Sequence, residues 1–165
     1  NIMIMNIDHL WDTGYFKWAW KNRNVYDLII GSKRADPTIN MQDNYRKILS
    51  SGLNSLLAFF FDSVVSDTHG MKMLKQKPAQ LIADQCVMRR GQFDTELTLR
   101  FLREQYSIAE LPMPYLDKRK PKNYMIKKVH QNIVDIFILI KVMKNIEYKG
   151  NIKYRRFCVD DLNLQ

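Results

Sequence analysis

The polar run "SDTHGMKMLK" at residues 66–75 directly follows the most apolar part of the chain, "LNSLLAFFFDSVV". This run contains an acid, two hydroxyls, a histidine, a glycine and two lysines. Asp67, Thr68 and His69 are consecutive in it. Gly70 would allow the backbone to turn tightly. The residue types are therefore typical of a turn.

Basic and hydroxyl side chains occur at three further points where they could hold phosphate groups. In "GSKR", Ser32 and Lys33 follow a predicted strand, although an ordinary turn has the same composition. Arg46 and Ser50 lie four residues apart near the start of a predicted helix, where free N–H groups also favour anions. The alternative for this pair is a solvent-facing stripe. Arg119 lies in the basic loop "KRKPKN", where it could hold a lipid phosphate or be a solvated side chain.

Three further acids lie where they could serve either a ligand or the local structure. Asp8 ends an apolar run that predicts a buried strand, and there it could hold a cation that bridges phosphates or cap the next helix. Asp94 and Glu96 fall in "FDTE" at the start of a predicted helix. Asp94 could be the N-cap of this helix, and the helix dipole favours Glu96.

Predicted strands alternate with predicted helices along the chain, which indicates an α/β fold. A long polar loop precedes the helix that carries Arg46, and prolines place the last strand at a sheet edge or at a strand end. The expected strands are residues 1–8, 25–32, 71–75 (strand or coil) and 106–116, and the expected helices are residues 13–22, 44–61, 78–87, 94–105 and 124–145.

The composition predicts a folded domain with a basic C-terminal third. Hydrophobic residues make up 46% of the chain and aromatic residues 12%, which is too apolar for a disordered protein. Residues 115–156 hold 12 Lys+Arg against 3 Asp+Glu, a net of +9, and the rest holds 14 against 14. Such a segment suits a polyanionic partner or is simply a solvated face. Nucleic acid is a poor candidate because no base-stacking or recognition-helix pattern is present.

The cysteines and apolar runs exclude other classes. Cys86 and Cys158 are far apart and show no metal-ligand spacing, so a reducing compartment is expected and a disulfide framework is not. No run reaches the roughly 18 apolar residues that a membrane span needs. The chain opens on "NIMIMNID" without an initiator Met. We therefore expect a fragment of a longer protein.

Five motifs resemble, in the same order, those of family-two glycosyltransferases with the GT-A fold. The branch that loads a sugar onto polyprenyl or dolichyl phosphate is the most similar. The resemblance covers about residues 1–128 and implies the C-terminal, acceptor-side part of a Rossmann-like domain, a mixed sheet with flanking helices whose N-terminal nucleotide-binding half is missing. The motifs are "YDLIIGSK", "NYRKILSSGLNSLLAFFF", "SDTHGMKMLK", "FDTELTLR" and "IAELPMPYLDKRKPKNYM".

The resemblance implies transfer of a sugar, with inversion, from a nucleotide sugar to a polyprenyl or dolichyl phosphate. The family's Asp-x-Asp metal motif reads Asn6-Ile7-Asp8 here, and one carboxylate fewer should weaken Mg²⁺ or Mn²⁺ binding at Asp8. By this resemblance the catalytic residues are Asp67, Arg46 and Asp94, the phosphate ligands are Lys33, Ser50, Arg119 and Ser32, and the sugar or acceptor turn contains Thr68, His69, Gly70 and Glu96.

The expected organisation has three parts: the transferase part at residues 1–128, an amphipathic and membrane-interfacial helix at 129–145, and a basic tail at 146–165. The protein would work at the cytoplasmic face of a membrane with an anionic surface. It would need the missing N-terminal half or a partner subunit for full activity. The alternatives are a non-catalytic glycosyltransferase-like scaffold and, less favoured, a basic nucleic-acid-binding domain.

Overall fold

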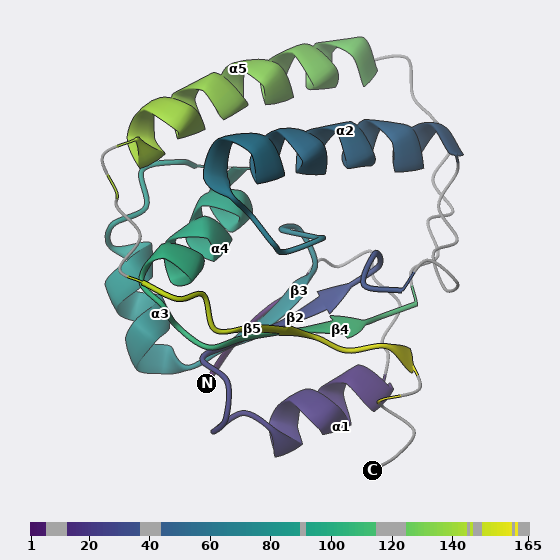
Figure 1. The fold of residues 1–165 in the computed structure, drawn as a ribbon, viewed down its shortest axis with the longest axis vertical. Coiled ribbons are helices and arrows are strands. Elements are labelled where there is room, and N and C mark those ends of the chain that lie inside the picture. Colours follow the sequence, from purple (N-terminus) through teal and green to yellow (C-terminus); the bar gives the residue numbers. More distant parts are fainter. Residues whose placement is uncertain are drawn as a thin grey trace.

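A computed structural model describes residues 1–5, 13–36, 44–89, 92–114, 125–144, 146, 150–159 and 161. These residues form a five-stranded mixed sheet with helices on both faces (Figure 1). The predicted α/β class, with a mixed sheet and flanking helices, is therefore confirmed. The elements are β1 (Ile2–Ile4), α1 (Thr13–Lys21), β2 (Leu28–Ser32), α2 (Asn44–Phe61), β3 (Met71–Leu74), α3 (Gln76–Ala83), α4 (Phe93–Arg103), β4 (Ile108–Pro112), α5 (Met125–Met143) and β5 (Tyr154–Arg156).

The sheet order β1-β3-β2-β4-β5 brings three parallel strands together at one side. Strand β2 pairs in parallel with β4, and β4 pairs in parallel with β5. Strand β3 runs antiparallel between β1 and β2. The carboxyl ends of β2, β4 and β5 therefore meet at one edge, which is where ligands bind in open α/β sheets.

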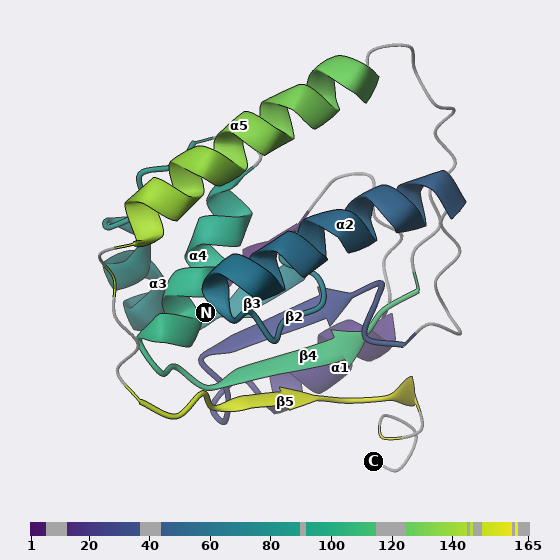
Figure 2. The same ribbon diagram turned by 45° about the horizontal axis from the view of Figure 1, so that its top comes forward.

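The core lies on both faces of β2 and β4, whose residues are all buried. Helix α1 covers one face, and α2, α4 and α5 lie over the other (Figures 1 and 2). Because successive strand residues point to opposite faces, Ile29 packs with Tyr15 and Trp18 of α1, while Leu28 and Ile30 join the cluster on the other face.

The apolar run at the start of the chain forms a strand, but it is not buried as predicted. Ile2 and Met3 are 37% and 36% exposed. The reason is position, since β1 lies at the end of the described sheet and pairs with β3 alone. The predicted cap of α4 is also wrong, because Gln92 and not Asp94 occupies the N-cap position.

Part of the basic tail belongs to the sheet. Residues Tyr154–Arg156 form β5, which lies along β4 (Figure 2). Helix α5, which precedes this strand, is fixed at its C-terminal end by Arg103 of α4, whose Nη1 donates hydrogen bonds to the carbonyls of Met143 and Ile146. Within the described ranges, no helix combines the length and apolar character that a membrane crossing requires.

Candidate functional site

A hollow of about 460 Å³ lies between α2 and the carboxyl ends of the parallel strands. Its described lining comes from four segments: the turn after β2, the exposed side of α2, the loop before β3, and the end of β5. Three cations and five hydroxyl or amide side chains face it, and no acid is among its described lining residues. They are Arg34, Lys47 and Arg156, with Ser51, Asn54, Ser55, Ser63 and Ser66. Such a set of donors suits an anion with several oxygens.

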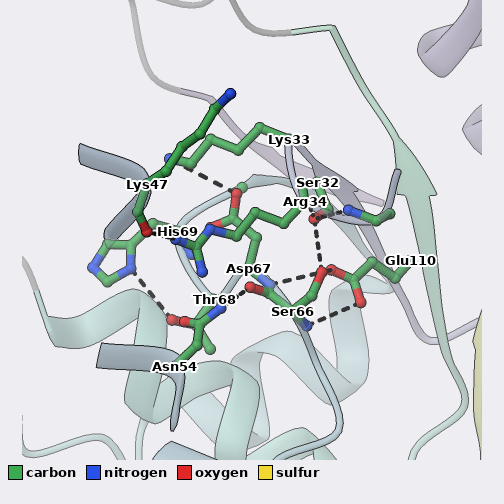
Figure 3. Close-up of polar contacts among 12 residues, drawn as sticks. Ser32, Lys33, Arg34, Lys47, Asn54, Ser66, Asp67, Thr68, His69 and Glu110 are labelled. Carbon is green, nitrogen blue, oxygen red and sulfur yellow. Dashed lines mark hydrogen bonds and ion pairs between the residues drawn. The ribbon is translucent and has the colours of Figure 1, made fainter. Parts of the chain in front are cut away.

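The turn after β2 is held by a single hydroxyl. Ser32 Oγ accepts the backbone N–H groups of Arg34 and Ala35 at 3.1 and 3.0 Å, and it lies 3.1 Å from Ser66 Oγ (Figure 3). Arg34 then reaches across to α2, where its Nη2 donates to the carbonyl of Lys47 at 3.5 Å. Ser32 was predicted as a phosphate ligand, and here its described contacts shape the turn that presents Arg34.

Glu110 of β4 lies beneath this site with its side chain fully buried. Its carboxylate accepts the backbone N–H groups of Ser66 and Asp67, at 3.1 and 3.2 Å, and the hydroxyl of Ser66 (Figure 3). It also accepts the hydroxyl of Tyr154 and lies 3.5 Å from Nε of Arg156. A buried carboxylate with these donors fixes the loop before β3 to strands β4 and β5.

The polar turn at residues 66–70 is compact and mostly buried. Asp67 is 5% exposed; its Oδ1 accepts the N–H of His69 at 3.0 Å, and its Oδ2 lies 3.9 Å from Nζ of Lys33. Thr68 Oγ1 lies 3.3 Å from Nδ1 of His69 and 3.1 Å from Oγ1 of Thr95 on α4. The structure thus places Lys33 beside the turn that contains Asp67, Thr68 and His69.

Gly70 is required by a close approach of two backbones rather than by an unusual φ angle. A Cβ atom at this position would lie 2.2 Å from the carbonyl oxygen of Gly31 at the end of β2. Real Cβ atoms do not approach backbone this closely, so any other residue must displace β2 or the turn.

Asp94 is engaged with a buried lysine. Lys72 Nζ is fully buried and lies 3.0 Å from the carbonyl oxygen of Gly70 and 3.2 Å from Oδ1 of Asp94. Burial lowers the pKa of Lys72, and the carboxylate of Asp94 acts in the opposite direction. The pair links the turn to the first turn of α4 and leaves Asp94 only partly exposed.

Glu96 has a complete set of structural partners. Its fully buried carboxylate accepts the backbone N–H groups of Val87 and Met88 and pairs with Arg100 at 2.8 Å. These contacts hold the segment before α4 against that helix. They account for the burial of Glu96 without any ligand.

The remaining predicted residues cannot be placed. Asp8 and Arg119 lie outside the described residues, and Arg46 and Ser50 lie on α2 with side chains outside the description. Their immediate neighbours Lys47 and Ser51 line the hollow.

The carboxylates near the hollow do not provide a metal centre. No group of three or more possible ligand side chains occurs within the described part of the chain. The oxygens of Glu110 and Asp67 already face hydrogen-bond donors or a lysine. Asp8, the predicted ligand, lies outside the described residues, so the Mg²⁺ or Mn²⁺ site stays a prediction.

Sequence reasoning missed these charged residues of the site: Glu110, Arg34, Lys47, Arg156 and Lys72. Glu110 gave a signal, because an acid inside the apolar strand "IAELP" must be buried with partners. Arg34 lies beside the predicted Lys33. Arg156 gave no signal, because it reaches the site only through the pairing of β5 with β4.

Comparison with protein-family models, curated proteins and solved structures finds no match to this chain. The site geometry and the resemblance of its motifs are therefore the grounds for a function.

Proposed function

We propose that this chain is the acceptor-side part of an inverting glycosyltransferase that moves a sugar from a nucleotide sugar to a polyprenyl phosphate. The observation that carries the proposal is the cationic hollow at the carboxyl ends of the parallel strands. Two phosphate-bearing substrates must meet in such an enzyme, and Arg34 and Lys47 would neutralise their mutual repulsion.

The reaction would be a single displacement at the anomeric carbon. An oxygen of the acceptor phosphate forms the new bond to that carbon while the bond to the nucleotide diphosphate breaks and its electron pair leaves with the diphosphate. A phosphomonoester has its second pKa near 6 and is largely dianionic at neutral pH, so it needs no general base. Catalysis then consists of positioning the two substrates and stabilising negative charge.

The contacts of the two candidate bases favour a phosphate acceptor over a sugar hydroxyl. Asp67 lies 3.9 Å from Lys33, and Asp94 lies 3.2 Å from Lys72. A hydroxyl acceptor requires a carboxylate oxygen open to its proton. One oxygen of each carboxylate instead lies near a lysine of the protein, which suits a reaction without proton abstraction. Asp67 would then orient the sugar or the acceptor through its place in the turn.

Exposed apolar side chains on α2 and α5 would accept the isoprenoid tail and the membrane surface. Phe59 and Phe137 are 79% and 66% exposed, an unusual exposure for such side chains. Among the side chains of these helices that the structure describes, the other large apolar residues that are exposed are Ile48, Leu56, Phe60, Ile133, Val134 and Ile138. On each helix their spacing places them on one side. The protein would therefore act at a membrane surface, with the acceptor phosphate in the hollow.

The test is sugar transfer by membranes of cells that express the whole gene. Labelled nucleotide sugars are supplied with polyprenyl phosphate or with the matching polyprenol, and the lipid product is quantified. We expect labelled lipid with the phosphate and none with the alcohol. Lys47→Gln should reduce the rate about ten-fold or more through loss of one phosphate contact.

The matched control is Lys77→Gln on α3, which removes the same charge at an exposed position outside the lining of the hollow. It should leave the rate unchanged. Transfer to the alcohol as fast as to the phosphate would refute the proposed chemistry. An equal loss in both lysine variants would show that overall charge, and not the hollow, carries the effect.

A further inference from the structure

Strand β5 brings a cation from the C-terminal tail into the hollow. Arg156 is the last residue of this strand and lines the hollow together with Arg34 and Lys47. It lies 92 residues from Val64, whose carbonyl accepts its Nη2 at 3.0 Å. Strand β5 thus contributes to the lining of the hollow as well as to the edge of the sheet.

The guanidinium of Arg156 is held in place on its inner side. Its Nε donates to the hydroxyl of Tyr154 at 2.9 Å, and that hydroxyl donates in turn to Glu110. Nε also lies 3.5 Å from Oε2 of Glu110. These contacts use Nε and Nη2, and Nη1 has no partner among the described residues. The side chain is 42% exposed, so a ligand can reach it.

The charge of this arginine is preserved by its surroundings. Burial lowers the pKa of Arg156, but the hydrogen bond with Tyr154 and the charge of Glu110 outweigh burial, and the pKa ends above its ordinary value. A guanidinium that is held in place and lines an open hollow is an efficient contact for a phosphate oxygen, because little side-chain freedom is lost on binding.

We infer that Arg156 binds a phosphate group of a substrate in the hollow, and that Tyr154 positions it through the hydrogen bond to Nε. This inference rests on the proposed function, because that proposal makes the ligand a phosphate. It assigns a binding role to β5, which has no counterpart in the motifs that the sequence shares with glycosyltransferases.

Binding of two probes to the purified chain tests the inference. Isothermal titration with geranyl monophosphate represents the acceptor, and titration with inorganic pyrophosphate represents the donor. Arg156→Gln should weaken binding of at least one probe about ten-fold. The probe with the larger loss identifies the substrate whose phosphate Arg156 contacts. Melting temperatures of all variants are recorded alongside.

Two further variants separate ligand binding from charge and from folding. Arg155→Gln removes the neighbouring charge on the same strand, where the guanidinium lies 4.6 Å from the ring centroid of Phe157 and outside the lining of the hollow. It should change affinity less than two-fold. Arg156→Lys keeps the charge but loses the planar fork, so it should recover part of the affinity. A purely structural role would make Lys as poor as Gln.

A measurement on the wild-type chain covers the case in which Arg156→Gln does not fold. Phenylglyoxal modifies exposed arginines, and mass spectrometry locates each site. Pyrophosphate or geranyl phosphate should protect Arg156 and leave Arg155 reactive. Equal protection of both arginines, or none, overturns the inference, as does unchanged affinity in a folded Arg156→Gln.

The outcomes also separate this inference from the proposed function. If Arg156→Gln leaves phosphate affinity unchanged, the inference is refuted, but the hollow can still be a phosphate site. Phosphate binding through Arg156, without any sugar transfer by the whole gene product, keeps the inference and removes the proposed reaction. Failure of the wild-type chain to bind either probe removes both.

Discussion

Replacing Glu110 by Gln is the sharpest test of how the site is held together. The amide has nearly the same shape as the carboxylate, but one oxygen becomes an NH₂ donor. The carboxylate accepts the N–H of Asp67 on Oε1 and the N–H of Ser66 on Oε2. Either orientation of the amide therefore places a donor against a backbone N–H. The hydroxyls of Ser66 and Tyr154 can rotate to accept, whereas a backbone N–H cannot.

The magnitude follows from these contacts. A buried N–H without an acceptor costs about 1–3 kcal/mol, and the remaining hydrogen bonds lose the contribution of an ionised acceptor. The lost ion pair with Arg156 adds little, because that guanidinium is 42% exposed. We expect the free energy of unfolding to fall by about 2–4 kcal/mol. For a chain of this size, that lowers the melting temperature by roughly 4 to 16 °C.

Urea unfolding followed by circular dichroism measures this change. The control is Asp84→Asn, which alters an exposed carboxyl at the end of α3 and should change the free energy of unfolding by less than about 0.5 kcal/mol. Equal stability of Glu110→Gln and wild type would refute the reasoning, because the observed donors could not then depend on an ionised acceptor.

Four further substitutions test other parts of the fold. Gly70→Ala should lower the free energy of unfolding by about 3 kcal/mol or more, because its Cβ would lie 2.2 Å from the Gly31 carbonyl oxygen. Gly52→Ala in α2 meets nothing within 4 Å and should raise it by about 0.5–1 kcal/mol; the opposite order in urea unfolding would contradict the close approach. Burial raises the pKa of Asp27, but hydrogen bonds from Ser107 and Lys75 outweigh burial and hold the pKa below its ordinary value of 3.8. The contribution of ionised Asp27 to the free energy of unfolding is therefore complete above about pH 4 and is lost as pH falls through the lower pKa of the folded state. Asp27→Asn should therefore make the free energy of unfolding fall less steeply with decreasing pH. Parallel curves of this free energy against pH for variant and wild type would contradict the prediction. Arg103→Leu should lower the free energy of unfolding by about 2 kcal/mol or more, because the carbonyls of Met143 and Ile146 lose their donor, and a loss below about 0.5 kcal/mol would exclude this contact as an anchor of α5.

Local signals in the sequence predicted most of the secondary structure. Apolar spacing placed α2 at residues 44–61, and the alternation of strands with helices predicted the α/β class. The exposure of β1 could not be predicted, because an apolar run does not reveal whether its strand lies inside a sheet or at the end of one. The same limit applied to β3, which the sequence left as strand or coil and which lies between two strands.

The residues of the candidate site likewise differ in whether a local motif or long-range strand pairing places them. Asp67, Thr68 and His69 are neighbours in one short motif, whereas the approach of Lys33 to Asp67 joins two motifs that are far apart in the sequence. Arg156 could not be predicted, because its place depends on the register of β5 against β4, which sets Arg156 opposite Glu110. Long-range strand pairing is decided by the packing of the whole sheet, and no local spacing in the sequence encodes it.

The charges around the hollow explain how it can be stable without a ligand and still favour an anion. Three cations line it, and burial lowers the pKa of Arg34 while the charges of Asp67 and Glu110 oppose that effect. Glu110 lies beneath the lining and compensates part of the positive charge through the protein side. The described lining of the hollow itself holds three cations and no acid. The positive charge that remains faces the open side of the hollow, where a phosphate dianion would complete the balance. The buried carboxylate thus lets the cations lie close together and leaves their attraction for phosphate in place.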